Sequence, residues 1–160
     1  MERSVALTIN TAITVLVIPL LPLAAIVGDK FLARRTWIGL AILGLGLVAW
    51  PLHAWILSSE GSLTSVLVFH AVTFALLSVP LGSCPTLFVE MFPESDRLSG
   101  YSVAFNLGMG VFGGLTPMIA TSLISMTGAA TAPALYMALA CAVAVVCLSL
   151  VKDRSRSPLR

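Results

Sequence analysis

Charged residues are scarce in this sequence. Nine Lys and Arg and seven Asp and Glu make up 10% of its 160 residues, against about 25% in a typical soluble domain. Hydrophobic residues account for 58% of the chain. This composition excludes a soluble enzyme, a nucleic-acid-binding protein and a disordered tail, so no nucleic-acid partner is expected.

Signatures of catalysis and of metal binding are also missing. The three cysteines, Cys84, Cys141 and Cys147, lie in apolar segments without the spacing of metal ligands or of a disulfide framework. The sequence has no H-E-x-x-H motif, no pair of intramembrane aspartates and no serine-protease loop. It therefore predicts a protein that is not an enzyme, with no catalytic residue, no metal and no cofactor.

Long uncharged segments make up most of the chain. Residues 4–28, 36–59, 61–89 and 98–151 contain no Lys, Arg, Asp or Glu, and a helix needs about 20 apolar residues to cross a bilayer. The first three segments each fit one span and the fourth fits two, with Gly128 and Pro133 suited to the break between them. We expect an all-α, polytopic membrane protein with about five transmembrane helices, at about 7–27, 36–57, 63–89, 100–126 and 133–151.

Basic residues collect in alternate loops and in the C-terminal tail. They are Lys30, Arg34 and Arg35 in the first loop, Arg97 in the third, and Lys152, Arg154, Arg156 and Arg160 in the tail. By the positive-inside rule, these two loops and the tail at 152–160 face the cytoplasm of a multi-pass protein in the plasma (inner) membrane. An odd number of spans without an internal repeat leads us to expect that the chain is part of a larger architecture.

The fourth predicted span is rich in glycine. Gly110, Gly113 and Gly114 allow another helix backbone to approach closely. Pro117 removes a backbone hydrogen bond, so we expect this helix to bend or break near its middle. Transporters use helices of this kind as flexible gates. Tight helix packing alone is the alternative explanation of the glycines.

His70 is the only titratable group well inside the third predicted span. An ionisable residue within a membrane suggests a proton relay or a polar contact to a substrate. The alternative is a neutral imidazole that is bonded to a neighbouring carbonyl. His53, near the outer end of the second span, is expected to lie at the membrane interface.

Two charged segments resemble a known family. Residues 25–34 resemble the cytoplasmic signature G-x-L-[SA]-D-R-x-G-R-[RK] of the major facilitator superfamily. Asp29, Lys30 and Arg34 match it in kind, while Ala25, Leu32 and Ala33 depart from it. Residues 90–117 resemble the E-[LM]-F-P-x-x-x-R-x-[ST]-G…[YF]-N…G-G-x-x-P segment of the metabolite:proton symporters in that superfamily. The matching residues there are Glu90, Met91, Phe92, Pro93, Arg97, Ser99, Gly100, Phe105, Asn106, Gly113, Gly114 and Pro117, and residues 132–136 are similar to the A-P-A-x-Y that opens the last helix of those carriers.

The resemblance covers essentially the whole chain. It implies that residues 1–160 are a partial C-terminal half of a major facilitator fold, equivalent to its helices eight to twelve. This branch includes proline/betaine, shikimate, citrate and α-ketoglutarate carriers. The implied function is secondary active transport of a small organic solute with protons across the lipid bilayer, as part of a complete carrier that includes the missing N-terminal half.

The resemblance also implies site residues. In such carriers the loop acid stabilises the inward-closed state, so Asp29 is the candidate acid and Arg97 its candidate partner, with Lys30 and Arg34 in the same conformational switch. Plain anchoring of the bases at the inner surface is the alternative. Glu90 is a candidate proton site or a structural partner within the cytoplasmic loop. Asn106 and His70 are candidates for the solute or proton pathway.

A second class of function stays open. The chain is then a truncated transporter fragment with no transport of its own, or a membrane module that acts only by pairing with other helices. A channel is disfavoured, because nothing in the sequence resembles a selectivity filter or a charged ring.

Overall fold

The computed structural model describes residues 3–151, with side chains described from Thr8 onward. The predicted tail at 152–160, with its four basic residues, lies outside the described residues, as does the side chain of Arg3. Within the described range every regular element is helical.

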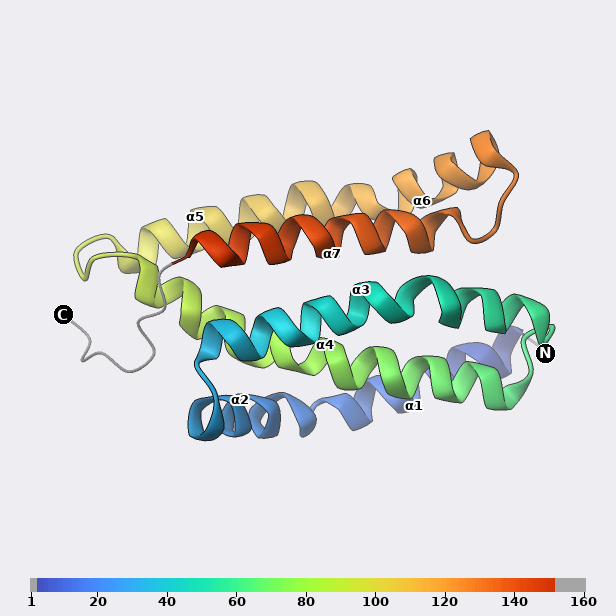
Figure 1. Cartoon of the computed structure of the whole chain (residues 1–160), viewed down its shortest axis with the longest axis horizontal. Coiled ribbons are helices and arrows are strands. Elements are labelled where there is room, and N and C mark those ends of the chain that lie inside the picture. Colours follow the sequence, from blue (N-terminus) through green and yellow to red (C-terminus); the bar gives the residue numbers. More distant parts are fainter. Residues whose placement is uncertain (1–2, 152–160) are drawn as a thin grey trace.

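The helices lie side by side in an elongated bundle (Figure 1). They are α1 (Arg3–Val17), α2 (Leu20–Phe31), α3 (Arg34–Ser58), α4 (Leu63–Met91), α5 (Arg97–Gly108), the π-helix η1 (Met109–Gly113), α6 (Gly114–Thr127) and α7 (Ala132–Leu150). Five segments built from them are long and apolar enough to cross a membrane, namely Thr8–Phe31, Arg34–Ser58, Leu63–Met91, Arg97–Thr127 and Ala132–Leu150. The prediction of an all-α chain with five helices of membrane-spanning length is confirmed.

The first of these segments is broken in the middle. α1 ends at Val17 and α2 begins at Leu20, because Pro19 has no N–H with which to continue the helical ladder. The N–H of Ile18 instead donates to the carbonyl of Val15 at 3.2 Å, which makes a tighter turn. The span predicted at 7–27 is therefore made of two helices.

The other helix ends follow from their local sequence. The Ser62 hydroxyl accepts a hydrogen bond from the N–H of Ser65 at 3.3 Å and caps α4. Gly128 ends α6 at a φ of +67°, a left-handed conformation that favours glycine. Pro133 lies in the first turn of α7, where its missing N–H costs nothing.

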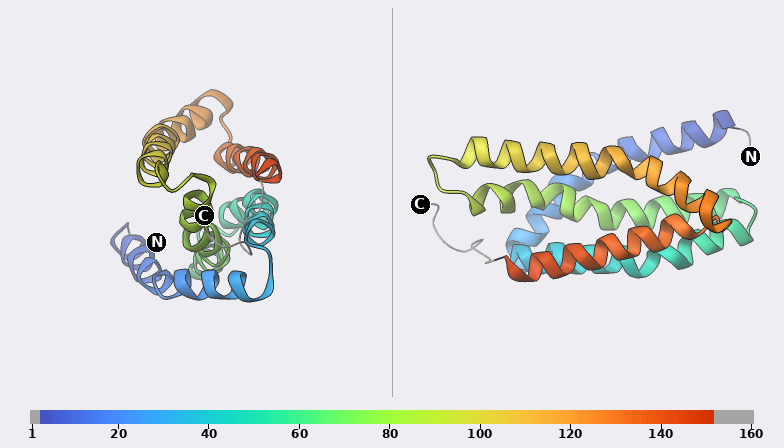
Figure 2. Two further views of the ribbon diagram at one scale, coloured as in Figure 1. Left: turned by 90° about the vertical axis from the view of Figure 1, so that its left-hand side faces the viewer. Right: turned by 90° about the horizontal axis from the view of Figure 1, so that it is seen from above.

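Helix α3 packs against α4 on one side and α7 on the other. α4 also contacts α1, α2 and α5, whereas α6 contacts α7. Within the described part of the chain, the α5–η1–α6 segment is thus joined to the other helices only through α7 and α4. Figure 2, seen along the bundle, shows this segment at one edge and the α1–α2 pair at the opposite edge.

The buried core is small and centres on α3. Ile38, Ala41, Leu45 and Ala49 recur every three or four residues on that helix and are buried against its neighbours. Many large apolar side chains elsewhere are exposed, which suits a bundle whose outer surface faces lipid rather than water.

Small residues let the helices come together. A Cβ at Gly82 of α4 would overlap the carbonyl oxygen of Leu21 on α2. A Cβ at Gly46 of α3 would lie 2.9 Å from Cβ of Cys141 on α7. Glycine at these two positions therefore sets how closely the helix pairs approach.

Gly82→Ala is expected to lower the free energy of unfolding by about 1–3 kcal/mol, because the new methyl meets backbone that cannot rotate away. The measurement is denaturant unfolding of the full chain in micelles. Gly110→Ala is the matched control, since nothing lies within 4 Å of a Cβ built there. Equal stability of the two variants would contradict the close approach of α2 and α4.

Candidate functional site: a charge cluster at one end of the bundle

Arg34 is the centre of the strongest polar cluster in the described residues. It is the first residue of α3 and is 7% exposed. Its Nη2 and Nε donate to Oδ1 of Asp29 at 2.7 and 2.9 Å, and its Nη1 donates to Oε1 of Glu90 at 2.5 Å. We call Asp29, Arg34 and Glu90 the Arg34 triad.

Three helix ends meet at this triad. Asp29 lies in the last turn of α2, Arg34 begins α3 and Glu90 lies in the last turn of α4. The α2–α3 and α4–α5 connections lie at the same end of the bundle (Figure 1), so residues 56 positions apart in sequence come into hydrogen-bond contact. The triad therefore links the ends of the three helices by charge.

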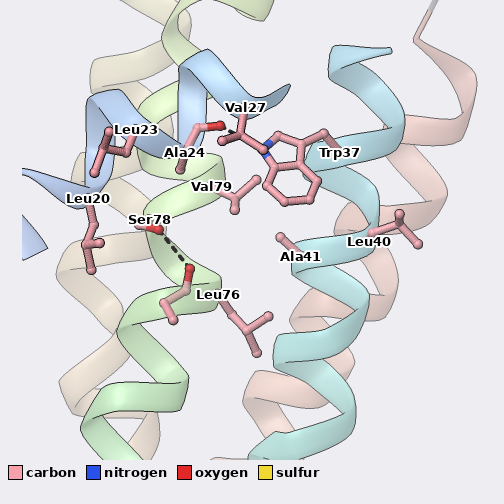
Figure 3. Close-up of a pocket in the computed structure, with 11 residues that line it drawn as sticks. Leu20, Leu23, Ala24, Val27, Trp37, Leu40, Ala41, Leu76, Ser78 and Val79 are labelled. Carbon is pink, nitrogen blue, oxygen red and sulfur yellow. Dashed lines mark hydrogen bonds between the residues drawn. The ribbon is translucent and has the colours of Figure 1, made fainter. Parts of the chain in front are cut away.

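The α2–α3 turn is fixed by Trp37. The indole Nε1 of Trp37 donates to the carbonyl of Ala24 at 2.9 Å (Figure 3). The indole also packs so closely on Gly28 that a Cβ there would overlap the ring. Gly28 is thus needed for packing, and the tryptophan holds the turn that places Asp29 beside Arg34.

The two ion pairs of Arg34 differ in exposure. The side chain of Glu90 is 12% exposed, whereas that of Asp29 is 52% exposed. The Arg34–Glu90 pair is therefore less screened by solvent and costs more to break than the Arg34–Asp29 pair. In the described part of the chain, Oε2 of Glu90 is buried without a hydrogen-bond partner.

Other bases lie around the triad. The Nζ of Lys30 lies 5.5 Å from the centroid of the Phe31 ring, a cation–π contact. Nη1 of Arg35 donates to the carbonyl of Val151 at 2.8 Å and so links α3 to the end of α7. Arg97 begins α5. The ion pair that the structure shows for Asp29 is with Arg34, and pairing with Arg97 stays a prediction.

The candidates for the solute or proton pathway lie apart from one another. Nδ1 of His70 lies 2.8 Å from the carbonyl of Val66 on its own helix, which is the contact with a neighbouring carbonyl that the structural alternative expects. His70 and Glu90 are 20 residues apart on α4, or about 30 Å along the axis. Asn106 is exposed on α5, where its Nδ2 donates to the carbonyl of Ser102 at 2.8 Å. The structure does not bring these three residues into one site.

The glycine-rich span is irregular at the predicted place. η1 covers Met109–Gly113, directly before α6, and Pro117 lies within the first turn of α6. Nothing lies within 4 Å of a Cβ built at Gly110, Gly113 or Gly114. A side chain at these positions would meet no other helix in residues 3–151, so the close packing predicted for this glycine face has no partner within that range.

The link between Arg34 and Glu90 was not predicted from the sequence. The sequence places Arg34 in the expected switch and Glu90 on the expected proton pathway or in the loop structure. The available signal for this pair was that Arg34 and Glu90 both lie at predicted cytoplasmic helix ends and carry opposite charges. Sequence spacing alone does not tell which base and which acid come together across two loops.

The chain is similar to several bacterial transporters. It is 29% identical over 119 residues to a citrate-proton symporter of Salmonella typhi, covering 73% of this chain and 26% of that protein. It is 31% identical over 122 residues to a citrate-proton symporter of Klebsiella pneumoniae, covering 75% and 27%. An ectoine/proline transporter of Corynebacterium glutamicum is 27% identical over 158 residues, or 96% of this chain and 30% of that protein.

These relatives are longer than the chain, which spans between a quarter and a third of their length. No family model and no solved structure matches it. The relatives are transporters rather than enzymes, which points away from an enzyme. Together with the five candidate spans, they point to an integral membrane protein.

A double-mutant cycle should separate the two ion pairs. We expect a coupling energy of about 1–3 kcal/mol between Arg34 and Glu90, and of about 0–1 kcal/mol between Arg34 and Asp29. The variants are Arg34→Gln, Glu90→Gln and Asp29→Asn with the two double changes, all measured by denaturant unfolding in micelles. A larger coupling energy for the Arg34–Asp29 pair than for the Arg34–Glu90 pair would contradict the expectation that the less exposed pair is the stronger one.

Proposed function

This chain is homologous to part of the metabolite:proton symporters of the major facilitator type, and we propose that it forms part of a carrier that moves a small organic solute together with protons. The resemblance predicted from the two loop motifs is confirmed by these relatives. The observation that carries the proposal is that the homology to citrate and proline carriers extends over most of the chain.

The proposed solute is small and organic. The relatives are named for citrate, proline and ectoine, all of which are compact and polar. In the proposed carrier, the five spans correspond to helices eight to twelve and the solute site lies between two halves. Asn106 and His70 are then candidates to line the solute or proton path, and the open glycine face at Gly110, Gly113 and Gly114 is available to helices outside this chain.

The Arg34 triad is the proposed conformational switch. A charge network that is made in one state and broken in another biases the equilibrium by its free energy in the first state. Arg34 uses only Oδ1 of the half-exposed Asp29, so a second base can approach that carboxylate. We assign this second position to Arg97, with Lys30 contributing positive charge beside it.

Glu90 is the proposed point at which the proton acts on the switch. Its Oε1 accepts from Arg34, and its Oε2 is buried without a hydrogen-bond partner in the described residues. A proton bound at Oε2 would remove the charge that holds Arg34 and so weaken the link between α3 and α4. Protonation and release of the helix ends would then be coupled.

The proposed carrier lies in the plasma (inner) membrane with the triad, the α4–α5 loop and the C-terminus on the cytoplasmic side. The distribution of Lys and Arg supports this orientation. The second candidate function is a fragment or a pairing module without transport of its own. It is favoured by the α5–η1–α6 segment, which has no buried residue in the described part of the chain.

Transport should require more than these five spans. We expect the 160-residue chain alone to give no saturable uptake in proteoliposomes with an imposed pH gradient. A chimera in which it replaces the matching segment of the citrate-proton symporter of Klebsiella pneumoniae should take up citrate above the level of empty liposomes. An inactive chimera that is inserted and folded would favour the fragment or module, and saturable uptake by the chain alone would contradict the need for further helices.

The switch is tested by exchanging charge in that chimera. Asp29→Arg and Arg97→Asp should each lower citrate uptake at least tenfold, and the double change should restore most of it if the two groups pair in one state. Initial uptake rates at matched protein levels are the measurement, with Arg35→Gln as a control base outside the switch. No rescue in the double variant would remove Arg97 from the switch.

A further inference from the structure

An apolar groove runs between α2, α3 and α4 near the triad end of the bundle (Figure 3). Its volume is about 460 Å³, which lies in the range of small-molecule sites. Leu20, Leu23 and Val27 of α2 face Trp37 of α3 and Val79 of α4 across it. Three of these side chains are substantially exposed at the rim, Leu23 by 55%, Val27 by 41% and Leu20 by 39%.

The groove offers almost no hydrogen bonding to an occupant. The hydroxyl of Ser78 donates to the carbonyl of Ala75 at 2.8 Å, and the indole N–H of Trp37 donates to Ala24. These two hydrogen bonds are the dashed lines in Figure 3, so both polar groups are already bonded within the chain. The occupant that fits this lining is a hydrocarbon chain.

A lysine lies one helical turn beyond the part of α2 that lines the groove. Lys30 follows Leu23 by seven and Val27 by three residues, so it lies on the same face of α2 as the apolar lining. Lys30 is exposed, and in the described residues no carboxylate lies within ion-pair distance of it. The neighbouring Asp29 accepts two hydrogen bonds from Arg34 through Oδ1, and Arg34 also pairs with Glu90. A cation at the end of an apolar groove between membrane helices complements an anionic lipid headgroup.

We propose that this groove binds one acyl chain of an anionic phospholipid, with the lipid phosphate at Lys30. The combination of an apolar lining and a lysine one helical turn beyond it favours this occupant over a further apolar helix, which supplies no anion. The proposal does not depend on the chain being a transporter. It requires only that the five spans lie in a bilayer.

Quenching of Trp37 fluorescence by brominated lipids tests the proposal. Trp50→Phe and Trp55→Phe leave Trp37 as the sole tryptophan of the three in the chain. The full chain is reconstituted in phosphatidylcholine bilayers in which a rising fraction is replaced by dibrominated phosphatidylglycerol or by dibrominated phosphatidylcholine. We expect half-maximal quenching at an about fivefold lower fraction of brominated phosphatidylglycerol than of brominated phosphatidylcholine. One lysine near the membrane surface favours an anionic lipid by about this factor.

Four variants locate the effect. Lys30→Gln should abolish the preference for the anionic lipid, and Lys30→Arg should keep it. Ala75→Phe fills the groove from an exposed lining position and should reduce quenching by both lipids. Ala71→Phe, one turn away on the same helix and also exposed, should leave it unchanged. Circular dichroism establishes that all four variants are equally helical.

Two results would overturn the proposal. Equal quenching by the two brominated lipids would mean that the groove meets bulk lipid without selecting a headgroup. Absence of quenching by either lipid would mean that a helix or a second copy of the chain covers the groove.

Discussion

The arrangement of the helix ends at which α2, α3 and α4 meet depends on one guanidinium. Arg34 is almost buried and lies between two carboxylates, Asp29 and Glu90. A buried charge is tolerated only when it is paired and hydrogen-bonded, so the ends of α2 and α4 must stay where their acids reach it. Trp37 and Gly28 contribute the packing that keeps the α2–α3 turn in this position.

The remainder of the bundle combines close contacts with large exposed apolar surfaces. Gly82 and Gly46 bring α4 to α2 and α3 to α7, and the buried face of α3 lies between α4 and α7. The α5–η1–α6 segment contacts α4 and α7 but has no buried residue within residues 3–151. Its π-helical turn and open glycines leave a loosely packed segment beside a tightly linked set, which fits a chain that spans only part of its relatives.

Charge and hydropathy were sufficient to predict the helices, but not their contacts. Uncharged segments of membrane length fix five spans because a bilayer accepts only helices whose backbone is satisfied internally. The break at Pro19 and the partner of Glu90 needed the structure. The sequence spacing places Asp29 and Arg34 in one loop, but it does not predict that α4 ends beside them.

The sequence by itself determined the all-α class, the five spans, the glycine-rich irregular helix and the resemblance to metabolite:proton symporters. These are properties of consecutive residues, read from hydropathy, proline, glycine and loop motifs. Only the tertiary structure decided that Arg34 joins Asp29 to Glu90, that His70 is bonded to its own helix, and that α2, α3 and α4 form an apolar groove. Each of these depends on which helix faces which, and that is set by close packing between segments far apart in the chain.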